Sequence, residues 1–221
     1  DRSLGESFLS AIQPFIWRRS LDFRQLKEIG AMSDRIRDHF SQGQAFGPGY
    51  DLKRGRGGTR EIEFFAQVHQ LIYGGRDPSL RVSATVDALA ALAKAGRIDG
   101  EDAERLAGHY ATLRRIEHRL QMIEDQQTHC LPTQAAALDA VARLDGLADG
   151  AELLAALEPV TADVADCYDQ LVVERATMAG LPREESELAG TLMAAGFEPP
   201  DAALRTIAEW RGGKLRALRS P

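Results

Sequence analysis

The sequence predicts an all-α protein, a multi-helix bundle with a small helical C-terminal appendage. Apolar residues recur three or four positions apart along most of the chain, and alternating β-branched runs are scarce. Glycine and proline punctuate the helical segments. The chain has 221 residues, of which 44% are hydrophobic and 27% charged, so it can bury a sizeable core and is not disordered.

The N-terminal part predicts two helices and a loop. The first helix covers about residues 6–18 and contains Pro14, which predicts a kink. The second follows Ser20 and stops near Phe40. Residues 41–49 contain several glycines and a proline and therefore predict a loop.

The central part predicts three helices. One begins after Gly57 and Gly58 and ends at about Tyr73, where two further glycines stop it. The next covers about residues 83–94, and a long helix follows Asp99, which can cap it. The long helix carries one apolar stripe, made of Leu106, Tyr110, Leu113, Ile116, Leu120 and Ile123.

The C-terminal part predicts four more helices and a boundary. The helices cover about residues 133–143, 151–178 (where Pro159 predicts a bend), 184–195 and 201–210. Because the pattern changes to short helices after residue 180, we expect a helical bundle domain over 1–180. Residues 181–221 are expected to form a short helical linker.

Composition excludes several classes of protein. The net charge of −6 disfavours a dedicated nucleic-acid binder. No apolar run approaches the roughly 20 residues that span a bilayer, and no signal peptide opens the sequence, so we expect a cytoplasmic protein without membrane contact. Cys130 and Cys167 have no CxxC partner and are expected to be reduced thiols. The missing initiator Met suggests a piece of a longer protein.

The sequence predicts no catalytic and no metal-binding residue. It has no Asp-x-Asp pair and no Gly-Ser turn, which a polymerase-β-like nucleotidyltransferase uses to hold Mg²⁺. P-loop, nucleophile-elbow and HExxH patterns are also missing. The five histidines lack metal-ligand spacing, so we interpret them as surface or core residues; they are His39, His69, His109, His118 and His129.

One segment is chemically unusual. Residues 53–60 contain four cations interleaved with three glycines, directly before a helix N-terminus. Glycines let backbone amides approach a ligand, and a helix N-terminus favours anions, so the segment suits a nucleotide phosphate or an acidic partner. A solvated basic loop fits the same residues equally well. The cations are Lys53, Arg54, Arg56 and Arg60.

Two acidic residues follow this segment. Glu61 and Glu63 can orient an arginine of the loop or accept a ligand hydroxyl. They can equally be first-turn acids that complement the helix dipole. The basic tail after Arg205, around Trp210, fits either an acidic neighbouring domain or a solvated linker face.

Several motifs resemble one enzyme family, glutamine synthetase adenylyltransferase/adenylyl-removing enzyme. The central match is KRGRGGTREIEFFAQ at residues 53–67. It is accompanied, in order along most of the chain, by PFIWRRSLDF at 14–23, QLIYGGRDPSL at 70–80, LRRIEHRLQMIEDQQT at 113–128 and WRGGKLRALR at 210–219.

The resemblance implies the helical domain that follows the N-terminal, deadenylylating nucleotidyltransferase domain. Such an enzyme attaches AMP to glutamine synthetase and removes it by phosphorolysis, which controls nitrogen assimilation. It uses Mg²⁺ and ATP or ADP, none of which the fragment alone is expected to bind tightly. Its partners are glutamine synthetase, a PII-type regulatory protein and its own nucleotidyltransferase domains. Because the carboxylate motif is missing here, the fragment alone is expected to be inactive.

Three roles remain open for the fragment. Lys53, Arg54, Arg56, Arg60, Glu61 and Glu63 are expected to complete the phosphate or nucleotide cleft of the catalytic domain. In the second role the helices dock a regulator or glutamine synthetase. In the third they are a rigid spacer between catalytic domains.

Overall fold

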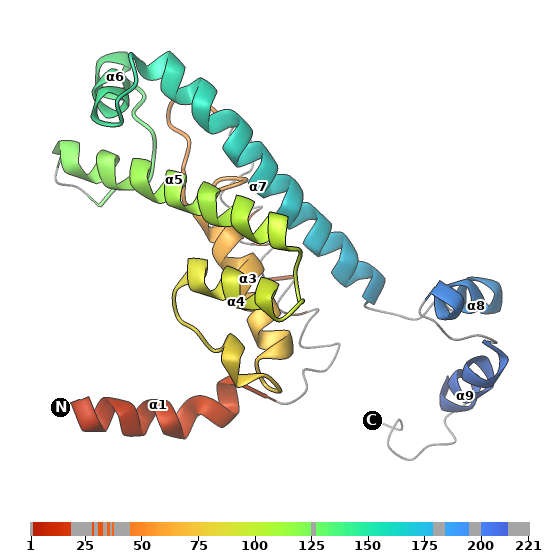
Figure 1. The fold of residues 1–221 in the computed structure, drawn as a ribbon. Helices are drawn as coiled ribbons and strands as arrows, with labels where there is room; N and C mark the ends of the chain where they lie inside the picture. The colour runs from red at the N-terminus through yellow and green to blue at the C-terminus, as the bar shows by residue number, and fades with distance from the viewer. Residues whose placement is uncertain are drawn as a thin grey trace. The chain divides into compact units, whose positions relative to one another are not determined.

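The computed structural model describes residues 2–18, 45–124, 127–178, 184–194 and 200–211, together with residues 28, 31, 32, 35 and 37. These residues contain eight α-helices and one 3-10 helix, and their only β feature is an isolated bridge between Asp51 and Cys130 (Figure 1). The prediction of an all-α bundle is confirmed. The helix expected after Ser20 lies almost entirely outside the described residues.

The helices follow the predicted segments closely, and only a short 3-10 helix was not predicted. In chain order they are α1 (Arg2–Ile16), α3 (Thr59–Tyr73), η1 (Pro78–Leu80), α4 (Thr85–Lys94), α5 (Gly100–Glu124), α6 (Ala135–Leu144), α7 (Gly150–Met178), α8 (Glu185–Ala194) and α9 (Asp201–Arg211).

Side-chain caps explain where two of these elements begin. Asp99 accepts hydrogen bonds from the backbone amides of Glu101 and Asp102 and so caps α5, as predicted. Asp77 accepts from the amide of Ser79 and starts η1. The buried side chain of Gln70 donates to the carbonyls of Leu80, the last residue of η1, and of Val82 just after it, and so joins the end of this turn to α3.

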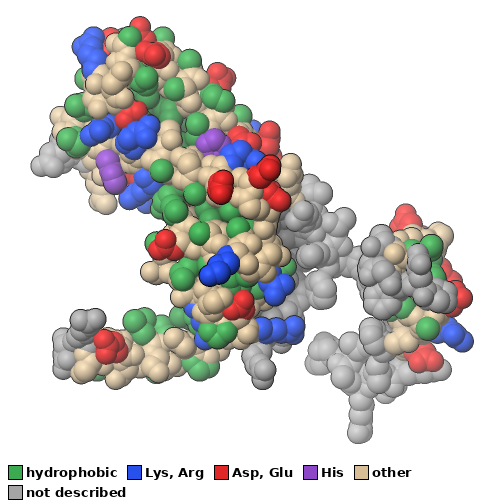
Figure 2. All heavy atoms as spheres, viewed as in Figure 1, with side chains coloured by type: hydrophobic (Ala, Val, Ile, Leu, Met, Phe, Trp, Pro, Cys, Tyr) green, Lys and Arg blue, Asp and Glu red, His purple; other side chains and the backbone are tan. Residues whose placement is uncertain are grey.

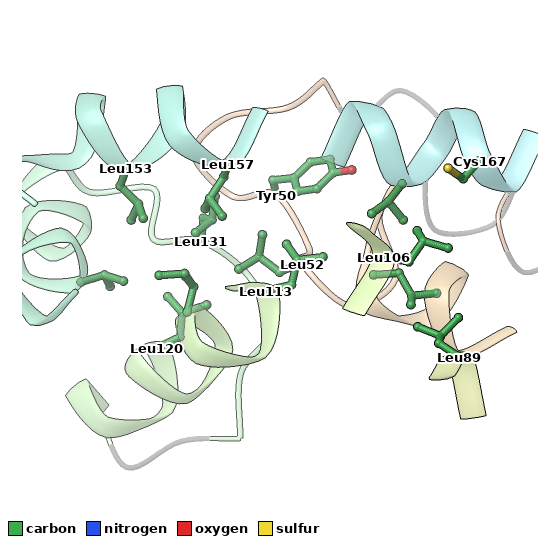
Figure 3. Packing of buried hydrophobic residues seen from close by; sticks show 14 of the residues in the cluster. Tyr50, Leu52, Leu89, Leu106, Leu113, Leu120, Leu131, Leu153, Leu157 and Cys167 are labelled. Atoms are coloured by element: carbon green, nitrogen blue, oxygen red, sulfur yellow. The ribbon is translucent and has the colours of Figure 1, made fainter. Parts of the chain in front are cut away.

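The core of residues 1–173, the first of two compact units, is built around an extended segment and not around helices alone. Tyr50, Leu52 and Leu131 are almost fully buried between α5 and α7 (Figure 3). Three backbone hydrogen bonds join residues 49–52 to residues 129–131: the amides of Gly49, Leu52 and Leu131 donate to the carbonyls of Leu131, His129 and Tyr50. This pairing fixes the start of the glycine- and arginine-rich segment inside the core.

The predicted stripe of α5 faces this core over most of its length. Leu106, Leu113, Ile116 and Leu120 are at most 3% exposed. Ile123, at the end of the stripe, is 37% exposed because α5 runs past its neighbours there. On the opposite side of the core, α7 contributes Leu153, Leu157 and Val164.

The second unit, residues 174–221, has its own small cluster, in which Leu188 and Leu192 of α8 meet Ile207 of α9. The boundary between the two compact units follows Val173 and lies within α7, seven residues before the predicted domain boundary at residue 180. The role of 181–221 as a linker stays a prediction. None of the described helices has the length and apolar character needed to cross a membrane.

Candidate functional site

The segment from Asp51 to Gly58 is a tight turn that Asp51 organises. The buried carboxylate of Asp51 accepts hydrogen bonds from the amides of Lys53 and Arg54, at 2.9 and 2.8 Å, and from Nε of Arg54 at 3.0 Å. The amide of Gly55 donates to the Asp51 carbonyl at 2.8 Å. One carboxylate therefore closes the turn and orients the first arginine.

The glycines serve close packing and do not present amides to a ligand. The amides of Gly57 and Gly58 donate to Glu61 Oε2 and to the Gly55 carbonyl, both at 2.9 Å. The next three amides, those of Thr59, Arg60 and Glu61, donate to carbonyls of the same segment. These five amides are therefore already hydrogen-bonded within the protein. Gly57 is required because its φ is +83° and a Cβ would lie 1.8 Å from the Thr161 carbonyl oxygen of α7.

Glu61 is directed into the protein. It is 8% exposed, its Oε2 accepts from Gly57, and its Oε1 lies 3.0 Å from Nε of Arg37. Burial raises the pKa of this carboxyl from 4.5 to about 7, although Arg37 and the Gly57 amide counteract the effect. Glu61 therefore orients an arginine, as one sequence interpretation proposed, but that arginine lies outside the loop.

Arg56 is also directed away from the other cations. Its Nη2 lies 2.8 Å from Asp169 Oδ2 and 3.6 Å from Asp166 Oδ1, both on α7. Asp169 also pairs with Arg37. The two arginines lower the pKa of Asp169 through hydrogen bonds, against the opposing effect of its partial burial. This ion-pair group joins the loop to α7.

The remaining candidates meet at an open pocket of about 400 Å³. Its walls are Lys53 and Arg54 from the turn, Arg60 and Glu63 from the first turn of α3, and His129 from the segment after α5. Glu63 also accepts a hydrogen bond from the hydroxyl of Tyr110, at 3.1 Å. The structure thus brings together four of the six predicted site residues and separates Arg56 and Glu61 from them.

Two pocket cations are available to a ligand. Arg54 is engaged by Asp51. In the part of the chain that the structure describes, neither the Lys53 ammonium nor the Arg60 guanidinium has an ion-pair partner. A pocket with two such cations and one hydroxyl-accepting carboxylate has the groups that a nucleotide phosphate and a sugar hydroxyl require.

His129 is the pocket residue that the sequence analysis missed. Its spacing carries no metal or catalytic motif, and only the pairing of Asp51 with Cys130 brings it beside Lys53. Its carbonyl is held by the amide of Leu52 at 2.9 Å. The neighbouring motif at residues 113–128 was the one sequence signal that pointed near it.

The other expected features lie elsewhere. Within the described ranges, no three His, Cys, Asp or Glu side chains converge on a point that could hold a metal ion. His69 contacts the Phe65 carbonyl, and His109 pairs with Asp163. His39 and most of the basic tail after Arg205 lie outside the described residues. Basic and histidine side chains also gather over the part of α5 that lies toward α6 (Figure 2).

The sequence of this chain is similar to those of known nucleotidyltransferases. Residues 30–172 match the family model described as GlnD PII-uridylyltransferase. The whole chain is 40% identical to a bifunctional glutamine synthetase adenylyltransferase/adenylyl-removing enzyme of Agrobacterium fabrum, and 39% and 37% identical to those of Caulobacter vibrioides and Rhizobium meliloti. In each case the chain covers 23% of the relative's length.

Proposed function

Because this chain belongs to the GlnD PII-uridylyltransferase family, we propose that it is the helical part of a nucleotidyltransferase that adenylylates and deadenylylates glutamine synthetase. The names of its relatives support this substrate and these two activities. The chain corresponds to about a quarter of such an enzyme, so the chemistry belongs to the assembled protein.

The pocket formed by Lys53, Arg54, Arg60, Glu63 and His129 is proposed to supply one wall of the nucleotide cleft. The observation that carries this proposal is a pair of cations, Lys53 and Arg60, that line the pocket and have no ion-pair partner among the described residues. Fixed cations of this kind stabilise the charge that develops on a transferring phosphoryl or adenylyl group. Asp51 fixes the backbone that carries Lys53, through hydrogen bonds from the amides of Lys53 and Arg54, and α3 carries Arg60.

The metal-binding part of the reaction is proposed to lie outside this chain. No carboxylate cluster fits Mg²⁺ among the described residues, and no Asp-x-Asp pair occurs in the sequence. We propose that another domain of the parent enzyme contributes the metal ligands, that ATP or ADP binds between that domain and this pocket, and that the fragment is inactive alone. Placement after the deadenylylating catalytic domain belongs to the same proposal.

The test is Arg60→Ala in the full-length enzyme. Phosphate-dependent release of AMP from adenylylated glutamine synthetase should fall by about 10- to 100-fold, since one charge-assisted contact to the reacting group is lost. Arg143→Ala is the matched control, because Arg143 is an exposed arginine on α6 whose only ion pair within the described residues is a long one, 3.9 Å, to Asp139. Unchanged AMP release by Arg60→Ala would contradict the proposal.

The same variant separates the two other roles. If the helices dock glutamine synthetase or a PII-type regulator through this surface, Arg60→Ala weakens partner binding but leaves basal turnover intact. If the chain is a spacer, neither quantity changes. Partner affinity measured beside AMP release therefore distinguishes all three roles.

A further inference from the structure

A buried carboxylate, that of Glu117, lies beside the imidazole ring of His129. Glu117 of α5 has a side chain only 2% exposed, and its Oε1 lies 2.8 Å from Nδ1 of His129. Its other oxygen pairs with Nη1 of Arg114. A carboxylate beside one ring nitrogen restricts the orientation of an imidazole.

The rest of the His129 environment is mixed in charge. The side chain is 19% exposed, so it is partly shielded from solvent while it lines the pocket. Nδ1 is buried beside Glu117, at 2.8 Å but without hydrogen-bond geometry, so the remaining nitrogen, Nε2, is the one that can reach a ligand. The titratable groups around His129 are Lys53, Arg54, Arg60 and Glu63 in the pocket, Glu117 and its partner Arg114 on α5, Cys130 next along the chain, and Asp51, which pairs with Cys130.

We infer that His129, positioned by Glu117, is a further cationic ligand of the pocket and donates its Nε2–H to a bound oxyanion, either a nucleotide phosphate or free orthophosphate. The inference rests on the proposed function and extends it to a residue of the segment after α5. It also gives the pocket a dependence on pH, because histidine changes its charge between about pH 5 and pH 8.

Sulfate is the appropriate probe, since it keeps its charge over this range. The 221-residue chain is titrated with sulfate at several pH values while the imidazole C–H signals are followed by NMR. The His129 signal is assigned by its loss in His129→Gln. We expect this signal to shift on binding, and sulfate affinity to fall about tenfold from pH 5 to pH 8 as a charge-assisted hydrogen bond is lost.

Glu61 also titrates in this range, so the difference between wild type and His129→Gln is the decisive quantity. The control is His109→Gln, because His109 is similarly shielded and also lies 2.8 Å from a carboxylate, Asp163, but outside the pocket. His129→Gln should flatten the pH profile, and His109→Gln should retain it. Glu117→Gln should weaken sulfate binding at low pH. Circular dichroism shows whether this variant is folded. If it is not, the shift of the His129 signal in the wild-type chain on sulfate binding still tests whether His129 contacts the anion.

Equal pH profiles for wild type and His129→Gln would overturn the role of His129 and leave the proposed function standing. The inference would also fall if sulfate bound nowhere on the chain, whereas the proposed function is decided separately by AMP release in the full-length Arg60→Ala enzyme. Competition experiments with orthophosphate and with ADP then identify the source of the oxyanion: it is the compound that displaces sulfate at the lower concentration. Displacement by neither would contradict a phosphate site.

Discussion

The backbone amide of Gly57 donates a hydrogen bond to Oε2 of Glu61, at 2.9 Å, inside the protein. This contact joins the glycine- and arginine-rich turn to the helix that follows it. Because Glu61 is used in this way, its carboxyl group supports the turn and does not face the pocket. The contact explains why two acids only two positions apart have separate roles, with Glu63 alone lining the pocket.

Gly57→Ala should destabilise the fold by at least about 2 kcal/mol, because the residue adopts a positive φ and its Cβ would meet the Thr161 backbone. The control is Gly108→Ala, since a Cβ at this exposed position of α5 has no neighbour within 4 Å. That change should stabilise by about 0.5–1 kcal/mol. Urea unfolding followed by circular dichroism measures both; equal midpoints would contradict the packing described for Gly57.

Glu61 should make the stability of the protein fall as the pH rises. Its pKa is raised from 4.5 to about 7 in the folded state, so the folded protein binds more protons than the unfolded chain between these values. The contribution is complete below pH 4.5 and is lost as the pH approaches 7, a change of about 3 kcal/mol at most. Glu61→Gln should flatten the unfolding free energy over this window. Glu104→Gln, at an exposed position of α5, should not.

Leu113→Ala should cost about 2–5 kcal/mol of unfolding free energy, because this fully buried side chain of α5 packs in the core beside Leu52. Met122→Ala on the same helix is the control, since Met122 is 64% exposed and should change stability by less than about 0.5 kcal/mol. Thermal unfolding of both variants checks the comparison. A similar loss from both would contradict the direction of the α5 stripe.

Arg56 and Arg60 should behave differently despite lying four residues apart. Arg56→Ala removes partly exposed ion pairs to α7 and should cost about 0.2–1 kcal/mol of stability without changing sulfate affinity. Arg60→Ala should leave stability unchanged and weaken sulfate binding several-fold. Calorimetric titration and urea unfolding of the two variants test this separation. The reverse assignment would mean that Arg56, and not Arg60, faces the ligand.

The helices could be predicted because each depends on local information. The cap at Asp99 and the apolar stripe from Leu106 to Leu120 both depend on residues within one continuous segment of the chain. The pocket depends on contacts that the sequence does not encode locally. Arg56 lies among cations, yet it turns toward acids of α7, and His129 reaches the pocket only through the pairing of Asp51 with Cys130.

That pairing also constrains the order in which the protein acquires its binding site. The walls of the pocket belong to two stretches of chain, residues 53–63 and residue 129, which are separated by the rest of α3, by α4 and by α5; the backbone hydrogen bonds of Leu52 and Leu131 join them. Contacts between such distant segments form slowly, since a long loop must close first. A refolding or newly synthesised chain therefore has helices before it has a pocket, and phosphate affinity becomes a direct measure of the last stage of folding.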